Sequence, residues 1–374
     1  MKKKKIAFFI PEIDIGGVEI NTLNLSHSIK NQFGRPLLIY LSEKNTELKR
    51  EFSQTMDLVK IKNRRSIFMF ASFKEMLDDH KPDVIVVSSF INLVHLTLLK
   101  KFIYFDLKII FKLETNLKKD LKNQSFLDLL LFLLFKSFSF KLCNLVICSC
   151  NALQESFTNS LKIKSPKIIT IYNPIVKTEH LILGFTKPDH KFFNNSSDNG
   201  KVFISIGRLV KSKGFIELIQ TFKKLISFEK MGKSKLLIIG SGYMLKSLNQ
   251  LINNLGLEES VDIIPFNNSF IDFLASADVF VSNSSYEGLN NNIVHALSQG
   301  KQVIATDCEF GPKEVLLNGK IGTLIKPGNN DELLKAMKDI FEHQDFSADL
   351  AIERSKDFCI DEISQQFISE IDLM

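Results

Sequence analysis

Short apolar runs alternate with segments of helical periodicity along the first half of the chain. Residues 6–10 form a continuous apolar run, which is typical of a strand buried on both faces, and the run ends at Pro11. A helix is predicted next, because apolar residues recur at Ile20, Leu23 and Ile29. Further strands are predicted at residues 36–41, 58–61, 84–87, 108–113, 145–148 and 168–172. This alternation predicts a doubly wound α/β domain.

The same alternation resumes after residues 185–200, a polar segment rich in Asn and Ser. Strands are predicted there at residues 202–206, 236–239, 261–265, 279–281, 302–306 and 322–325. We therefore expect a second α/β domain, with the boundary near residue 180. The predicted domains are residues 1–180 and 181–355, and residues 356–374 continue a helical pattern that begins at residue 351.

Residues 126–142 are unusually apolar. They are predicted to form a buried helix that packs on the sheet. A second, compatible interpretation is that the outer face of this helix rests on the inner leaflet of a membrane, with Lys122, Lys136 and Lys141 nearby. No stretch reaches the roughly 20 apolar residues needed to span a bilayer. The apolar run at residues 6–10 is too short for a signal peptide. We expect a cytoplasmic protein that contacts the inner face of the plasma membrane.

Charge is distributed unevenly along the chain. Residues 1–175 hold 27 Lys and Arg and 16 Asp and Glu, a net charge of +11, whereas the remainder carries −5. The basic first half indicates an anionic surface or acceptor as its partner. The five cysteines are scattered and are predicted to be reduced core thiols. Neither Cys nor His occurs at metal-ligand spacing, so no metal site is predicted.

Two runs in the second half carry candidate chemistry. In the first, a strand leads into Gly207, Arg208 and then Lys213, directly before a helix. A guanidinium and an ammonium at such a place suit a diphosphate, because both stabilise the negative charge that builds on a phosphate leaving group. In the second run, a strand leads into Glu287 and Gly288 and then into a helix. Loops after the carboxyl ends of parallel strands form the ligand crevice of such a sheet.

The chain resembles glycosyltransferase family 4, a large group of retaining enzymes with the GT-B fold. That family shows G-R-L-x-x-x-K-G, which Arg208 and Lys213 reproduce, and S-x-Y-E-G-x-x-N-x-x-x-E-A followed by G-P-x-E. The matching positions of the second run are Ser284, Tyr286, Glu287, Gly288, Asn291, Ala296, Gly311, Pro312 and Glu314. The sequence departs from the family at the second Glu of this run, whose position is His295.

This resemblance implies two Rossmann-like domains that face each other across a cleft, with the donor on the second domain and the acceptor on the first. It implies a metal-independent, retaining hexosyltransferase without cofactors that uses a nucleotide-diphosphate sugar, and UDP is the expected nucleotide. The expected acceptor is a lipid-linked glycan of a bacterial surface polysaccharide, O-antigen or capsule. No nucleic-acid partner is expected. The helix at residues 356–374 is expected to cross back to the first domain.

The resemblance also implies roles for individual residues. Arg208 and Lys213 would bind the diphosphate, Glu287 the sugar hydroxyls, and Glu114 would lie beside the reacting sugar. Because a neutral His295 cannot replace a bidentate carboxylate, the contact with the ribose is expected to be weaker. His95 is predicted to be structural. The implied donor-binding residues are Gly16, Gly17, Gly207, Gly240, Gly242, Phe266, Gly288, Leu289, Asn290, Asn291 and His295.

Two other functions remain open from the sequence. A nucleotide-sugar 2-epimerase shares the GT-B fold, although the runs around Arg208 and Glu287 favour transfer. A catalytically degenerate subunit that binds a nucleotide sugar is supported by His295. Dinucleotide redox enzymes are disfavoured, because no G-x-G-x-x-G opens the first strand–helix unit.

Overall fold

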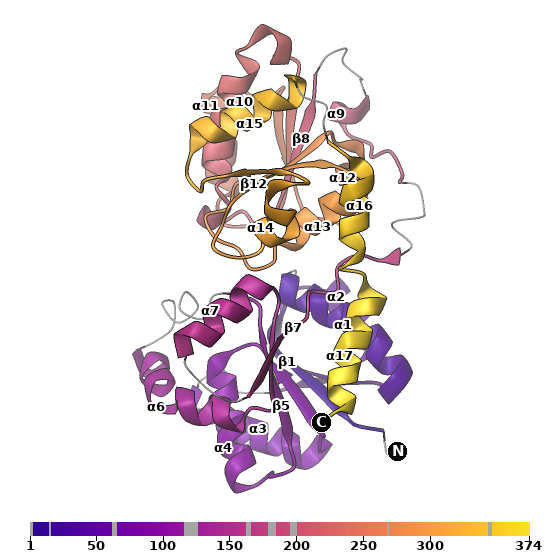
Figure 1. The fold of residues 1–374 in the computed structure, drawn as a ribbon, viewed down its shortest axis with the longest axis vertical. Helices are drawn as coiled ribbons and strands as arrows, with labels where there is room; N and C mark the ends of the chain where they lie inside the picture. Colours follow the sequence, from indigo (N-terminus) through magenta and orange to yellow (C-terminus); the bar gives the residue numbers. More distant parts are fainter. Residues whose placement is uncertain are drawn as a thin grey trace. The chain divides into compact units, whose positions relative to one another are not determined.

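The chain folds into two α/β units, as Figure 1 shows. Unit 1 comprises Met1–Ile175 and Ile360–Met374, and unit 2 comprises Val176–Cys359. The predicted architecture of two Rossmann-like halves is confirmed, whereas the predicted boundary at residue 180 lies outside the described residues. The structure, a computed structural model, describes residues 3–14, 16–61, 66–115, 126–161, 166–178, 185–194, 200–267, 269–342 and 346–374.

Unit 1 is built on a seven-stranded parallel sheet with the order β3-β2-β1-β4-β5-β6-β7. The direction in which strands are added reverses between β1 and β4, as in other doubly wound sheets. The strands are β1 (Ile6–Ile13), β2 (Leu37–Glu43), β3 (Asp57–Lys60), β4 (Val84–Val87), β5 (Lys108–Leu113), β6 (Leu145–Cys148) and β7 (Lys167–Thr170). The helices are α1 (Gly17–Phe33), α2 (Thr46–Thr55), α3 (Ser66–His80), α4 (Phe90–Phe102), α6 (Phe126–Leu142), α7 (Asn151–Leu161) and α17 (Ile360–Asp372).

Strand β1 continues through Pro11, where the apolar pattern predicts its end. The pairing of β1 with β4 stops at Phe9 and Val87, so that edge has no partner strand at Pro11. On the other edge, the register with β2 includes Ile10 and Glu12 but omits Pro11. A proline lacks the N–H group, and it is tolerated in a strand where the ladder does not need that donor.

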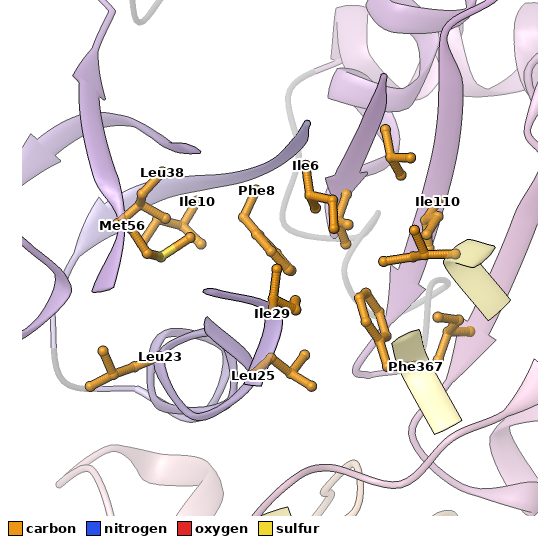
Figure 2. Packing of buried hydrophobic residues seen from close by; sticks show 14 of the residues in the cluster. Ile6, Phe8, Ile10, Leu23, Leu25, Ile29, Leu38, Met56, Ile110 and Phe367 are labelled. Atoms are coloured by element: carbon orange, nitrogen blue, oxygen red, sulfur yellow. The ribbon is translucent and has the colours of Figure 1, made fainter. Parts of the chain in front are cut away.

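The core of unit 1 lies on both faces of this sheet. Figure 2 shows Ile6, Phe8 and Ile10 of β1 among side chains of α1 and Phe367 of α17. The rings of Phe8 and Phe367 stack with their centroids 6.1 Å apart. Because side chains alternate along a strand, Phe9 points to the opposite face, where its ring meets Phe73 of α3 at 5.2 Å. Helices α4 and α6 cover the same face farther along the sheet, through the aromatic contacts Phe90–Phe132 and Phe111–Phe140.

Unit 2 is built on a six-stranded parallel sheet with the order β10-β9-β8-β11-β12-β13. The strands are β8 (Val202–Ile206), β9 (Lys235–Ile239), β10 (Val261–Ile264), β11 (Val279–Ser282), β12 (Gln302–Thr306) and β13 (Thr323–Ile325). The α-helices are α9 (Lys191–Asn194), α10 (Phe215–Ile226), α11 (Leu245–Asn254), α12 (Phe270–Ser276), α13 (Asn291–Ser298), α14 (Pro312–Val315), α15 (Asn330–Glu342) and α16 (Ala348–Lys356). The short 3₁₀ helices are η1 (Lys211–Lys213), η2 (Glu229–Met231) and η3 (Leu317–Gly319). Helices α10, α11 and α15 share one core with the sheet.

The helical pattern of residues 351–374 is divided between the two units. Helix α16 packs on α13 of unit 2, and α17 packs on α1 of unit 1. Between these two helices, Phe358 O accepts a hydrogen bond from Val176 N–H (3.0 Å), and the backbones of Cys359 and Val176 form an isolated parallel β-bridge. The two places where the chain passes between the units therefore lie side by side.

The role of α17 in the core of unit 1 generates a first prediction. Truncation of the buried Phe367 to Ala removes its contact with Phe8, and we expect Phe367→Ala to lower the free energy of unfolding by about 3–5 kcal/mol. Urea denaturation of the full chain measures this loss. The matched control is Leu373→Ala near the same chain end, where the side chain is 78% exposed and the change should be below about 0.5 kcal/mol. Equal effects of the two variants would contradict the assigned packing of α17.

Candidate functional site

The predicted polar residues of unit 2 lie at the point where its strand order reverses. Strands β8 and β11 are neighbours in the sheet. Strands β9 and β10 continue the sheet beyond β8, and strands β12 and β13 continue it beyond β11. At such a switch point the loops that leave neighbouring strands diverge, and the crevice between them is the usual ligand site of an open parallel sheet. The loop after β8 carries Arg208 and Lys213, and the loop after β11 carries Glu287.

Lys213 and Glu287 form an ion pair across this switch point. Lys213 Nζ lies 2.5 Å from Glu287 Oε1, and the two side chains are 20% and 11% exposed. A charge-assisted hydrogen bond of this length is stronger than one between neutral groups, and partial burial shields it from solvent screening. The sequence assigned these residues to different parts of a donor, and the structure brings them into contact.

Two further side chains hold the same carboxylate oxygen. Ser284 Oγ donates to Glu287 Oε1 at 2.5 Å, and Asn290 Nδ2 donates to it at 3.1 Å. Asn290 Nδ2 also lies 2.9 Å from Ser282 Oγ at the end of β11. Asn290 has φ 62° and ψ 81°, a left-handed conformation in which Asn is favoured over most other residues. Glu287 is therefore fixed from three directions.

The backbones of the two loops are also fastened together. Asn283 Nδ2 donates to Gly214 O at 3.0 Å, and Ser285 N–H donates to Ser212 O at 2.8 Å. Gly214 has φ 66°, and a Cβ there would collide with Asn283 O. Only glycine permits this close approach directly before α10.

The predicted donor-binding glycines bring further loops close to this point. Gly207 N–H donates to Ile239 O, and Leu209 N–H donates to Ser241 O, so the loops after β8 and β9 are paired. A Cβ at Gly240 would collide with Gly207 O, and a Cβ at Gly242 with the backbone of Leu209. The backbone contacts alone require glycine at these positions, with or without a bound phosphate.

The loop after β12 approaches the Glu287 loop in the same way. A Cβ at Gly311 would collide with the carbonyl of Gly288 and lie close to that of Leu289, both of which are buried positions. Asn291 begins α13 directly afterwards, and Asn292 Nδ2 donates to Ile206 O at 2.9 Å. The amino end of α13 is thus held against the end of β8.

Arg208 differs from Lys213 in its surroundings. Its side chain is exposed and, within the part of unit 2 that the structure describes, it forms no ion pair. The side chain of Lys213 passes close to Gly207. A Cβ added at Gly207 would lie 3.5 Å from Lys213 Cε. The guanidinium of Arg208 is therefore available to an anion beside a pair whose charges cancel.

Aromatic side chains gather around His295. The His295 ring meets Phe270 edge to face with centroids 5.1 Å apart, and Phe270 meets Phe266 at 5.1 Å. His295 is half-buried in α13. The sequence singled out His295 and Phe266 but missed Phe270, which begins α12 four residues after Phe266.

The predicted residues of unit 1 belong to two groups, one after β1 and one after β5. Gly16 precedes α1 and Gly17 begins it, and a Cβ at Gly16 would collide with the Glu19 carboxylate. This carboxylate therefore lies at the amino end of α1, where the helix dipole favours negative charge.

The second group surrounds Glu114 at the carboxyl end of β5. Lys112 Nζ lies 2.5 Å from Glu114 Oε1, and both side chains are largely buried. The ammonium of Lys112 also lies 3.2 Å from Asn173 Oδ1. The carboxylate that the resemblance places beside the reacting sugar is thus charge-paired inside unit 1.

His95 and the cysteines lie where the sequence predicted. His95 is buried in α4 beside Phe73, which is consistent with a structural role. All five cysteines are buried and none forms a disulfide, and burial raises the pKa of Cys143 and of Cys148 to about 12, which keeps both thiols protonated. The described residues contain no group of three or more His, Cys, Asp or Glu that could hold a metal ion. Among these residues there is also no helix whose length and apolar character would let it cross a membrane.

Both halves of the chain match glycosyltransferase families. Residues 15–178 match the model of Glycosyltransferase Family 4, and residues 186–357 match that of Glycosyl transferases group 1. The solved structure of the Anabaena protein HepE in complex with UDP has the same fold, with a TM-score of 0.79 and 21% identity. It aligns with 99% of this chain and 100% of HepE.

Two named relatives are similar over part of their length. An uncharacterized glycosyltransferase of Methanocaldococcus jannaschii is 34% identical over 244 residues, which is 57% of this chain and 59% of that protein. The N-acetylgalactosamine-N,N'-diacetylbacillosaminyl-diphospho-undecaprenol 4-alpha-N-acetylgalactosaminyltransferase of Campylobacter jejuni is 30% identical over 142 residues, 38% of each chain. Glycosyltransferases of lipopolysaccharide core and amylovoran biosynthesis also match.

The contact of Gly214 with Asn283 generates a second prediction. Gly214→Ala adds both φ strain and a backbone collision, so we expect it to lower the free energy of unfolding of unit 2 by about 2–4 kcal/mol. Gly256→Ala is the matched control, because Gly256 has a similar φ of 62° with open space around it, and about 1 kcal/mol is expected. Chemical denaturation measures both. If the two variants lose the same stability, the collision is unimportant and the two loops are not held together at this point.

Proposed function

Because the chain belongs to the GT-B glycosyltransferases, we propose that it transfers a hexose from a nucleotide-diphosphate sugar to a lipid-linked glycan and retains the anomeric configuration. The observation that carries the proposal is the Lys213–Glu287 ion pair beside the exposed Arg208, at the switch point of unit 2. This arrangement combines cations for a diphosphate with a carboxylate for sugar hydroxyls.

Transfer requires the bond between the sugar and the diphosphate to break, and negative charge then builds on the leaving phosphate oxygen. Arg208 supplies a planar, permanently charged fork, and Lys213 supplies a point charge. Both would stabilise the departing phosphate more strongly than the intact donor, which lowers the barrier. These two cations would provide the positive charge that a metal ion provides in other transferases, so we propose a metal-independent reaction.

Glu287 would orient the sugar. Its Oε1 is occupied by Lys213, Ser284 and Asn290, and Oε2 takes part in none of these three bonds. A carboxylate accepts hydrogen bonds only, which suits the hydroxyl groups of a hexose. The phosphates would meet the backbone amides of Gly288, Leu289, Asn290 and Asn291 at the start of α13. In unit 1, we propose that Gly16 and Gly17 approach the donor or the acceptor, and that Glu114 lies beside the reacting sugar.

The nucleotide and the acceptor are supported by the named relatives. HepE was solved with UDP, which favours a UDP-sugar as donor. The Campylobacter jejuni relative acts on a diphospho-undecaprenol glycan, and other relatives act in lipopolysaccharide synthesis, which favours a lipid-linked acceptor of a surface polysaccharide. The net charge of +11 in residues 1–175 suits such an anionic acceptor at the cytosolic face of a membrane.

Release of UDP from a panel of UDP-sugars, with and without a lipid-linked acceptor extract, tests the proposal. We expect acceptor-dependent release that EDTA leaves unchanged, and a product whose anomeric configuration, read by NMR coupling constants, equals that of the donor. Binding of UDP-sugar without release would instead identify a degenerate subunit. Conversion of the donor to an isomer without acceptor would identify a 2-epimerase. An inverted product would overturn the retaining mechanism.

The two cations generate a third prediction. We expect Arg208→Ala and Lys213→Ala each to lower kcat/KM by about 10²–10³-fold, because each removes a charge that stabilises the leaving phosphate. Lys211→Ala is the matched control, since Lys211 is an exposed cation in the same short turn and should retain activity within about twofold. Steady-state rates of UDP release measure all three. Loss of activity in the Lys211 variant alone would contradict the assignment.

The ion pair generates a fourth prediction that separates binding from turnover. Glu287→Gln keeps the shape of the side chain but no longer neutralises Lys213, so we expect UDP to bind about threefold to tenfold more tightly. We expect kcat to fall about a hundredfold, because the carboxylate that orients the sugar is lost. Calorimetric titration with UDP and rate measurements check the two effects.

Glu229→Gln, a change of an exposed carboxylate in η2, serves as the control for this variant and should alter neither quantity. Weaker UDP binding by the Glu287 variant would show that the ion pair is needed to shape the phosphate site. It would contradict the expectation that the charge of Glu287 weakens UDP binding by neutralising Lys213.

A further inference from the structure

Helix α6 of unit 1 exposes an apolar face. Leu129, Leu130, Leu133 and Leu134 are 39%, 41%, 58% and 66% exposed. Their spacing places them on two adjacent turns of one side of the helix. A contiguous exposed apolar patch on a soluble domain usually marks a surface that binds another molecule.

Two buried aromatic side chains already anchor α6 in unit 1. Phe132 packs edge to face on Phe90 of α4, with ring centroids 4.7 Å apart. Phe140 is fully buried, and its ring centroid lies 5.7 Å from that of Phe111 of β5. The core therefore does not need the exposed leucines, and they remain available to a partner.

Apart from Asp128 in the first turn of α6, the charged residues of the two packed helices are all lysines. Lys136 and Lys141 belong to α6, and Lys100 and Lys101 end α4. Lys100 Nζ donates to Asn144 Oδ1, just beyond α6, so the two basic ends are neighbours. Neither α4 nor the part of α6 after residue 128 contains an Asp or Glu, and the first carboxylate that follows α4 is Asp106 in the next turn. Lys122, which the sequence also placed nearby, lies outside the described residues.

We propose that this face, Leu129, Leu130, Leu133 and Leu134 with Lys136 and Lys141, docks on an anionic phospholipid bilayer. The leucines would enter the boundary between headgroups and acyl chains, and the ammonium groups would meet lipid phosphates. Residues 129–141 span about 18 Å along the helix axis, so α6 lies on the surface rather than across the bilayer.

The charges favour this partner over a second copy of the chain. Self-association through α6 would bring the ammonium groups of Lys136 and Lys141 against their own copies, with no carboxylate on the face to offset them. An anionic lipid surface instead attracts each of these groups. The proposal needs no step of sugar transfer, so vesicle binding and UDP release succeed or fail separately.

The chain contains no tryptophan, which permits a single introduced probe. Leu134→Trp places the probe on the proposed face, and Leu350→Trp places it on α16 of unit 2 at a leucine of similar exposure, 59%. The vesicles contain phosphatidylglycerol and phosphatidylcholine in equal amounts, with pure phosphatidylcholine as comparison. We expect a blue shift of emission, and quenching by brominated acyl chains, for Leu134→Trp with the anionic vesicles. No shift is expected for Leu350→Trp.

Sedimentation with the same vesicles separates the apolar from the charged contribution. The double variant Leu133→Gln and Leu134→Gln keeps helix propensity and should lower the partition coefficient at least about tenfold. Lys136→Gln with Lys141→Gln should lower it about fivefold per lysine at low salt. Lys230→Gln with Lys233→Gln on unit 2 is the charge-matched control and should have no effect. UDP release with a soluble acceptor should be unchanged in all of these variants.

Three results would overturn the proposal. The unaltered chain could remain in the supernatant with anionic vesicles. The leucine variant could sediment as well as the unaltered chain, while circular dichroism shows both folded. Finally, the leucine variant could convert a dimer to a monomer in size-exclusion chromatography without any change in vesicle binding, which would identify a second copy as the partner.

Discussion

The ion pair of Lys213 and Glu287 fixes the geometry of the candidate site. Each partner stands on a loop that leaves one of two neighbouring strands, so the pair sets the distance between the loops. Loss of either partner would leave the other charge partly buried and unpaired, which costs far more than the pair itself contributes. The hydrogen bond from Asn283 Nδ2 to the backbone carbonyl of Gly214 also holds the two loops together. The two loops consequently behave as one structural element.

In the proposed reaction, this arrangement would change how the cations attract a donor. Glu287 offsets the charge of Lys213, so the pair contributes little net field at a distance. Arg208, which is exposed, would supply the charge that first attracts a diphosphate. A bound phosphate would then share the ammonium of Lys213 with Glu287. The attraction between this ammonium and the leaving phosphate would grow with the negative charge of the phosphate, which would favour the transition state over the bound donor.

Much of the fold follows from local pattern, because buried strands and amphipathic helices leave periodic apolar residues. Failures occur where distant parts decide the outcome. The extension of β1 through Pro11 depends on β4 ending early, and the split of the last helical pattern depends on Phe358 meeting Val176. At the site, the motif residues Lys213 and Glu287 are predictable, but their contact is not, since it requires β8 and β11 to be neighbours. Asn290 was predicted as a donor-binding residue but missed as a support of Glu287, although an Asn-rich link before a helix does indicate a left-handed residue. Phe270 was missed as a neighbour of His295.

The glycines of the site and its charged residues carry different information about activity. Gly240, Gly242 and Gly311 are required because neighbouring backbones leave no room for a Cβ. A chain that only binds a nucleotide sugar needs them as much as an enzyme does, since both must fold. Arg208 has no such structural duty, because its exposed side chain forms no ion pair with the described residues of its own unit. An exposed guanidinium beside a neutralised ion pair is therefore better evidence for phosphate chemistry than the glycines around it.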